Sequence, residues 1–292
     1  MTRRGLVVGC GGTVGFAWSV AALHSLSRDL AWDPRSAEVM VGTSAGAELV
    51  AILAAGFTVD DVLAALTDQP HAPALLRDHF AACPGALPPV PALGFAAPRL
   101  PRVGAHPLAR LAGLLPLGRG DQTWLHRLGD ALAPQVAHRD TLLVAADRDT
   151  GERVVFDAAT GPLGPAIAAS WAIPGWFPPV EIGGRAHIDG GVLSPTSADL
   201  LVSRGLDEVV VIAPMTSAGP APARGLSRLE RLLRRPMSRL LDAEAAALRA
   251  AGTVVHRIEP GPEDLAAMGP NFMDPRRALS TVETALRVRA PR

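Results

Sequence analysis

The sequence predicts an α/β fold, a three-layer α/β/α sandwich around a mostly parallel central sheet. Short apolar runs of the length of buried strands alternate along the chain with longer segments of helical periodicity, which is the order that parallel sheets produce. Hydrophobic residues make up 48% of the 292 residues, which is ample for one large core. We therefore expect a single domain over residues 1–292.

Buried strands are expected wherever a short apolar run is bounded by turn residues. The expected strands cover 6–9, 38–41, 141–145, 153–156, 186–189, 208–214 and 253–258. The third and fourth strands are joined by the turn Asp147-Arg148-Asp149-Thr150-Gly151. Acidic residues are typical of solvated turns, so we expect no metal there.

Helices are expected where apolar residues recur at helical spacing and capping residues mark the ends. They cover 15–30, 47–55, 58–66, 121–132, 163–172 and 224–251, the last with a break at Pro236, and a terminal helix follows Asp274-Pro275. Thr58 is a suitable N-cap, because Asp60 and Asp61 follow it in the first turn.

Prolines interrupt the chain between Pro70 and Pro116 too often for regular secondary structure. The stretch is too apolar for a solvated linker, and long loops in compact domains are commonly functional. We expect a cap or lid at about 70–118 that covers the site and lines an apolar acyl groove.

The segment 224–251 combines leucines at helical spacing with many arginines. Two interpretations fit this pattern. We favour a helix whose apolar stripe faces the core and whose charged face is solvated. The alternative is a basic surface that rests on anionic lipid headgroups.

Composition and charge exclude several classes of protein. The 28 basic residues, all arginine, balance 28 acidic residues, so no net charge favours nucleic acid as a partner. The two cysteines, Cys10 and Cys83, form no disulfide framework and no zinc motif, which indicates a reducing, cytoplasmic location. Glycines around Cys10 argue against a signal peptide, and no apolar run is long enough to cross a bilayer. Any membrane association is expected to be peripheral.

The pentapeptide Gly42-Thr43-Ser44-Ala45-Gly46 lies between an expected strand and an expected helix. Small residues two positions before and after a serine let the backbone turn sharply and lift the hydroxyl above a helix N-terminus. A small-residue turn that merely contains serine has the same five residues. The strand before it and the helix after it favour a nucleophile.

The loop Gly9-Cys10-Gly11-Gly12-Thr13-Val14-Gly15 connects the first expected strand to the first helix. Such loops present backbone N–H groups to an anion. The dinucleotide fingerprint does not fit, because Val14 stands where its third glycine belongs. We favour an oxyanion hole, which needs two donors near a nucleophile, over a nucleotide loop or a plain tight turn.

Asp189-Gly190-Gly191 ends the strand expected at 186–189. Paired glycines permit a tight turn that leaves a carboxylate free at the strand end, although an Asx turn is the commonest role of an Asp-Gly pair. Parallel sheets place their sites at the carboxyl ends of strands. We therefore expect Asp189, Ser44 and the glycine loop to lie together at that edge.

These motifs, in this order, resemble those of the patatin-like phospholipase family. The motifs are 9–15, 42–46, the segment from Ile173-Pro174 to Pro178-Pro179, and 189–191, and they span nearly the whole chain. The resemblance implies a patatin-like α/β/α domain without cofactor or metal. It implies hydrolysis of lipid or other acyl esters, as a phospholipase A or a carboxylesterase.

The resemblance also implies the roles of individual residues. Ser44 resembles the nucleophile and Asp189 its base in a dyad that forms an acyl-enzyme, and the amides of Gly11 and Gly12 resemble the oxyanion hole. Further candidate donors are Cys10 and Ala45. Supporting turns are formed by Gly9, Gly15, Gly42, Gly46, Gly190 and Gly191. Two positions depart from the family pattern: Cys10 replaces a glycine, and Val14 replaces a basic residue.

Two other functions fit parts of the sequence. An α/β-hydrolase would use a triad of Ser44, either Asp189 or Asp207, and His256, with His187 as another histidine near the acid. That fold normally has several strands before its nucleophile, whereas Ser44 follows the second strand. The other alternative is a catalytically weak lipid-binding or interaction protein that keeps the fold, which the altered glycine loop suggests.

Overall fold

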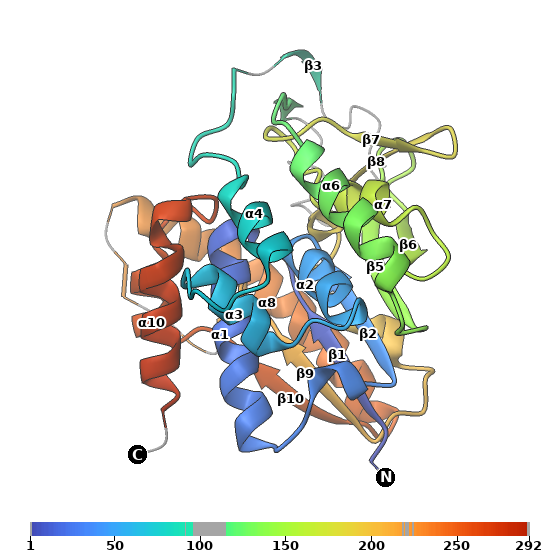
Figure 1. Cartoon of the computed structure of the whole chain (residues 1–292), viewed down its shortest axis with the longest axis vertical. Helices are drawn as coiled ribbons and strands as arrows, with labels where there is room; N and C mark the ends of the chain where they lie inside the picture. The colour runs from blue at the N-terminus through green and yellow to red at the C-terminus, as the bar shows by residue number, and fades with distance from the viewer. Residues whose placement is uncertain are drawn as a thin grey trace.

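The computed structural model describes residues 2–90, 92–95, 115–217, 219, 222–223 and 225–290. Its main sheet has the order β10-β9-β1-β2-β5-β8-β7, with β6 also paired to β5 (Figure 1). The strands are β1 Arg4–Val8, β2 Val39–Thr43, β5 Thr141–Asp147, β6 Arg153–Asp157, β7 Val180–Ile182, β8 Arg185–Asp189, β9 Glu208–Ile212 and β10 Val254–Ile258. A separate small sheet pairs β3 Ala92–Phe95 with β4 Pro116–Leu117.

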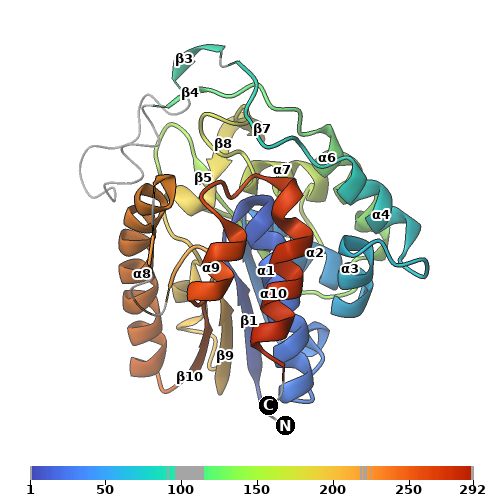
Figure 2. The ribbon, with the colours of Figure 1, turned by 90° about the vertical axis from the view of Figure 1, so that its left-hand side faces the viewer.

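Helices cover both faces of the main sheet (Figure 2). One layer contains α1 Gly12–Asp29, α2 Ala45–Ala54, α3 Val59–Leu66, α4 Ala74–Ala81, α6 Thr123–Leu132, α7 Leu163–Ser170, α9 Pro262–Met268 and α10 Ala278–Val288. The opposite layer contains α8 Leu226–Ala250 and the 3₁₀ turn Ala198–Leu201. Strands β10, β9, β1, β2 and β5 are parallel, whereas β6 and β8 run antiparallel to β5. The predicted three-layer, mostly parallel α/β/α fold is therefore confirmed.

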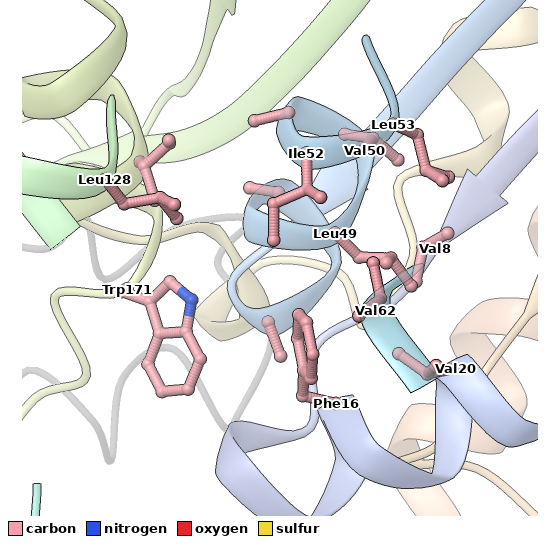
Figure 3. Close-up of a cluster of buried hydrophobic side chains, with 14 of the residues drawn as sticks. Val8, Phe16, Val20, Leu49, Val50, Ile52, Leu53, Val62, Leu128 and Trp171 are labelled. Atoms are coloured by element: carbon pink, nitrogen blue, oxygen red, sulfur yellow. The ribbon is translucent and has the colours of Figure 1, made fainter. Parts of the chain in front are cut away.

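The core lies on both faces of the sheet, because successive strand residues point to opposite sides. Leu6 and Val8 of β1 pack in the layer of α1 and α2, whereas Val7 packs in the layer of α8. Figure 3 shows Phe16 of α1 and Leu49 of α2 gathered near Val8. Both helices begin inside a candidate site motif, α1 at Gly12 and α2 at Ala45, so the core fixes where these motifs lie.

The expected strands are confirmed, as are most of the helices, with boundary shifts of a few residues. Thr58 caps α3 in a capping box with Asp61. Asp274 accepts a hydrogen bond from the backbone of Arg276 and caps a 3₁₀ turn, Pro275–Arg277, that leads into α10.

A helix occurs inside the proline-rich segment, where the sequence predicts no regular structure. Residues 74–81 contain no proline and form α4, which begins directly after Pro73. Leu76 is fully buried and His79 nearly so, so α4 belongs to the core. Residues 91 and 96–114 of the expected cap lie outside the described residues.

Helix α8 continues through Pro236, where the sequence predicts a break. Proline removes one helical hydrogen bond, but Arg234 before it and Leu241 after it are both buried, so packing holds the helix together. The expected core-facing stripe is found in the second half, where Leu241 and Leu248 are buried, whereas Leu226, Leu232 and Leu233 in the first half are exposed. Within the described part of the chain, α8 included, no helix has both the length and the apolarity to cross a bilayer.

Candidate active site

Ser44 occupies a strained turn between β2 and α2. Its backbone angles are φ 56° and ψ −122°, a region that side-chain-bearing residues rarely adopt. Two glycines make room for the turn: a Cβ at Gly46 would lie 1.9 Å from the carbonyl oxygen of Val8, and one at Gly42 would lie 2.4 Å from that of Gly46. The pentapeptide thus forms the sharp strand-to-helix turn that the sequence predicts.

Asp189 lies at the end of a strand whose direction differs from the parallel one that the sequence predicts. β8 is not a parallel strand, because it runs antiparallel to β5. β2 pairs with β5 as far as Thr43 opposite Val144, and β8 pairs with the next residue of β5, since Ala145 lies opposite Asp189. β6 occupies the other side of β5. β2 and β8 therefore pair with successive stretches on the same side of β5 and run in opposite directions. As a result their carboxyl ends meet, end to end.

The Asp189 carboxyl group lies in a buried position, with 5% of the residue exposed. Burial raises its pKa to about 7, and hydrogen bonds from the Ser44 side chain and the Gly191 backbone oppose this rise. The Gly191 N–H donates to Oδ1 at 2.7 Å, which is the contact of an Asx turn. The same carboxyl group therefore holds its own turn and contacts the Ser44 hydroxyl.

Ser170, the last residue of α7, fixes the backbone of Ser44. Its hydroxyl accepts a hydrogen bond from the Ser44 N–H at 2.7 Å and donates one to the Val144 carbonyl oxygen at 2.6 Å. Ser170 is fully buried. No sequence pattern marks this contact, because Ser170 lies 126 residues from Ser44 and belongs to no motif of its own.

The glycine loop lies beside the Ser44 turn, because β1 and β2 are parallel neighbours that end at the same level. Gly12 has φ +59°, and a Cβ there would lie 2.6 Å from the Phe272 ring, so the position requires glycine. Among the described residues, none accepts a hydrogen bond from the N–H groups of Gly11, Gly12 or Ala45. These three donors are free to bind an anion.

Cys10 is not available as a donor, which corrects one of the sequence-based candidates. Its N–H donates to the Pro195 carbonyl oxygen at 2.8 Å, just as the Gly9 N–H donates to Ile212 at 2.9 Å. The N–H groups of both residues, which come directly after the end of β1, are therefore occupied by backbone hydrogen bonds. These bonds fix the start of the loop, and the free donors begin at Gly11.

Packing accommodates the two departures from the family pattern. The Cys10 side chain lies against Gly191, where an added Cβ would be 3.1 Å from the sulfur, and burial raises the pKa of the thiol. Val14 is fully buried, and its N–H donates to the Phe272 carbonyl oxygen at 3.0 Å. The loop is thus anchored by core packing and backbone hydrogen bonds, without a basic side chain at position 14.

A mainly apolar cavity of about 190 Å³ lies beside the first turns of α1 and α2. Its wall includes Thr13 of the glycine loop, Glu48 just after the Ser44 pentapeptide, and Trp124 and Trp171. The Nε2 atom of His79 donates to Glu48 Oε1 at 2.8 Å, and both side chains are 3% exposed. This pair was not predicted from the sequence, although a glutamate inside an otherwise apolar helix is a signal of a buried partner.

Among the described residues, neither histidine of the triad alternative is hydrogen-bonded to Ser44 or to Asp189. His256 lies on β10, which β9 and β1 separate from β2, and its Nε2 atom lies 3.5 Å from Glu208. Asp207 accepts a hydrogen bond from the backbone of Arg3, at the opposite end of the sheet from Ser44. His187 is buried, and its Nδ1 atom lies 3.3 Å from the carbonyl oxygen of Val180. The triad interpretation is therefore wrong.

Comparison with known proteins places this site in a family. A family model described as patatin-like phospholipase matches residues 6–202, more than half of the chain. The chain belongs to the patatin-like phospholipase family. The match includes β1, β2, β5 and β8, with all the candidate catalytic residues, and it ends before β9 and α8.

Among relatives of this patatin-like protein are uncharacterized NTE family proteins of Mycobacterium bovis and Mycobacterium tuberculosis. Each is 38% identical over 108 residues, which is 35% of this chain and 29% of the relative. The chain thus matches less than a third of the length of these relatives. A structural neighbour is VipD from Legionella pneumophila, with 16% identity and a TM-score of 0.42, over 98% of this chain and 67% of that one.

Proposed function

We propose that this protein is a lipid acyl hydrolase, of the phospholipase A or carboxylesterase type, with a Ser44–Asp189 dyad. The observation that carries the proposal is the end-to-end meeting of β2 and β8, which sets the Ser44 hydroxyl against a buried carboxyl group. Membership of the patatin-like phospholipase family supports a lipid ester as the substrate.

The reaction would proceed through an acyl-enzyme. Asp189 takes the Ser44 proton as the oxygen attacks the ester carbonyl carbon, and it returns that proton to the departing alcohol. Water then attacks the acyl-enzyme and passes a proton to Asp189. Asp189 returns that proton to the Ser44 oxygen as it departs, which releases the carboxylic acid and restores the serine hydroxyl. A carboxyl group with a pKa of about 7 is a stronger base than one with the ordinary value of 3.8.

Free N–H groups would stabilise the negative oxygen that forms during each attack. Gly11, Gly12 and Ala45 supply them at the starts of α1 and α2, where the helix dipoles also favour negative charge. The apolar cavity beside these turns supports binding of the acyl chain, since Phe16, Phe80 and Trp171 contribute to its wall.

A serine-directed probe and a substrate panel test the proposal. We expect a fluorophosphonate to label the wild-type protein once, at Ser44, and to leave Ser44→Ala unlabelled. The wild type should hydrolyse p-nitrophenyl esters or phospholipids, and Ser44→Ala and Asp189→Asn should each lose at least about 100-fold in rate. Absence of labelling and of hydrolysis in the intact wild type would instead favour a non-catalytic lipid-binding protein.

A further inference from the structure

Arg234 of α8 is almost completely buried, with 2% of the residue exposed. Its Nη1 atom donates hydrogen bonds to the carbonyl oxygens of Pro214, at 2.5 Å, and Thr216, at 3.0 Å. Its Nε atom donates to Glu230, one turn earlier on the helix. The guanidinium group is therefore fixed on two sides, by its own helix and by the loop that follows β9.

The loop that Arg234 holds lies against the proposed oxyanion hole. The last residues of β9 and β1 pair with each other, so Pro214 lies beside the glycine loop at the same edge of the sheet. The Pro214 ring packs on this loop: a Cβ added to Gly11 would lie 2.8 Å from its Cγ atom, and one added to Gly15 would lie 3.3 Å from its Cβ atom. Pro214 thus connects Arg234 with the residue that supplies the first free N–H group.

The acid beside Arg234 does not cancel the positive charge at this place. Glu230 is buried and is shared between Arg234 and Arg231, so two cations share one anion and one positive charge remains. The glycine loop lies within reach of this charge. Burial raises the pKa of the Cys10 thiol and the negative charge of Asp189 adds to that rise, whereas the positive charge of Arg234 opposes it. The loop therefore lies between the proposed base and a buried cation.

Burial of a cation costs free energy that a neutral donor would not lose. A neutral side chain can donate to two carbonyl oxygens, and it gives up far less hydration when it is buried. The charge of Arg234 has a use at this place, because a negative oxygen is expected beside Gly11 during each attack on the ester. Little water lies between buried groups, so their charges are weakly screened.

We propose that Arg234 is a positioning residue of the proposed oxyanion hole, which acts through Pro214 and whose charge favours the negative oxygen. This role of Arg234 rests on the proposed hydrolase function. It places part of the catalytic support on α8, which contributes no residue to the motifs of the site.

Three substitutions separate the charge of Arg234 from its packing. Arg234→Gln and Arg234→Lys both lose the guanidinium fork, so both should lower the urea midpoint of unfolding, but only glutamine loses the charge. We expect kcat for a soluble ester to fall at least about tenfold in Arg234→Gln with KM changed less than about twofold, and to stay within about threefold of the wild type in Arg234→Lys. Glu230→Gln keeps an oxygen that can accept from Arg234 but removes the opposing charge, so it should lower the urea midpoint without lowering kcat.

Arg235→Gln is the matched control, because Arg235 is the next residue of α8 and is exposed. Water screens its charge, so kcat and the urea midpoint should both remain those of the wild type. Equal losses of kcat in the two Arg234 variants, or a similar loss in Glu230→Gln, would overturn the proposed role of Arg234, because packing alone would then explain the effect. An unchanged kcat in Arg234→Gln would overturn it as well. A wild type that neither reacts with a fluorophosphonate nor hydrolyses esters would instead overturn the hydrolase proposal and, with it, the role of Arg234.

Discussion

At the scale of single residues, the surroundings of Asp189 set both its reactivity and its effect on stability. Burial raises its pKa from the ordinary 3.8 to about 7. As a result the group becomes a stronger base, but it is ionised in the folded protein only near and above neutral pH. Its protonation state therefore connects the proposed chemistry to the stability of the fold.

Activity should follow the ionisation of Asp189. We expect kcat/KM for a soluble ester to rise about tenfold per pH unit below neutrality and to level off above about pH 7. Asp189→Asn should lose this rise together with at least about 100-fold in rate. A wild-type profile that stays flat from about pH 5 to about pH 8 would contradict the assignment of Asp189 as the base.

The same substitution should stabilise the protein at high pH. Because the folded pKa is raised, the folded state holds a proton that the unfolded state releases, so stability falls as pH rises from 3.8 to about 7. Asparagine avoids the buried charge and can still accept the Gly191 hydrogen bond. Urea unfolding should show Asp189→Asn more stable than the wild type above about pH 7, by on the order of 2–4 kcal/mol, and the difference should vanish near about pH 4.

Ser170 should affect both the rate and the stability, because it bridges two buried backbone groups. Ser170→Ala leaves the Ser44 N–H and the Val144 carbonyl oxygen without this partner, so we expect a loss of about 1–3 kcal/mol in urea unfolding. The kcat of a soluble ester should fall about tenfold with little change in KM. Ser19→Ala is the control, since Ser19 is equally buried but its hydroxyl has no partner among the described residues.

The turns that hold Ser44 and Asp189 could be predicted because short-range patterns mark them. A serine between small residues and an aspartate before paired glycines carry their signal within five residues. Ser170 could not be predicted in this way. Its role depends on the distance between segments that are far apart in the chain, and a serine at the end of a small-residue helix is common.

At the scale of secondary-structure elements, the direction of β8 is the main difference from the sequence-based prediction. An apolar run that ends in Asp-Gly-Gly indicates a strand, but nothing in the run indicates whether the strand is parallel. β7 and β8 are joined by Gly183 and Gly184, both with positive φ, in a tight hairpin. That hairpin reverses the chain, so β8 runs toward the carboxyl end of β2. Asp189, the last residue of β8, therefore lies next to Ser44.

The Glu48–His79 pair should be a measurable link between α2 and α4. Glu48→Ala leaves a buried imidazole without its partner, so we expect a loss of about 3 kcal/mol in urea unfolding. His79→Ala should also destabilise the protein, and the double variant should lose less than the sum of the two, because the interaction is removed only once.

A surface pair of the same kind is the control for this link. His24 and Asp60 are 2.7 Å apart, but the Asp60 side chain is 80% exposed. Asp60→Ala should therefore change the stability by less than about 1 kcal/mol. Additive effects at Glu48 and His79 would show that the two side chains are buried together without stabilising each other.

At the scale of the whole molecule, α8 supports the site from the opposite face of the sheet. Glu244 accepts hydrogen bonds from the hydroxyls of Ser194 and Thr196 and from the Ala198 N–H. Pro195, within this loop, accepts the hydrogen bond from Cys10 that fixes the start of the glycine loop. A continuous set of contacts thus joins α8 to the proposed oxyanion hole, although α8 lies beyond the range of the family match.

This arrangement predicts an effect on catalysis from a residue that touches no substrate. Glu244→Gln keeps the size of the side chain but removes its charge, and an amide cannot accept all three hydrogen bonds. We expect kcat for a soluble ester to fall about tenfold with KM nearly unchanged, and the free energy of unfolding to fall by about 1–3 kcal/mol. Asp242→Asn, on the same helix but with a side chain that is 62% exposed, should change neither quantity appreciably. A fall in stability without a fall in kcat would mean that α8 holds the fold together but does not position the glycine loop.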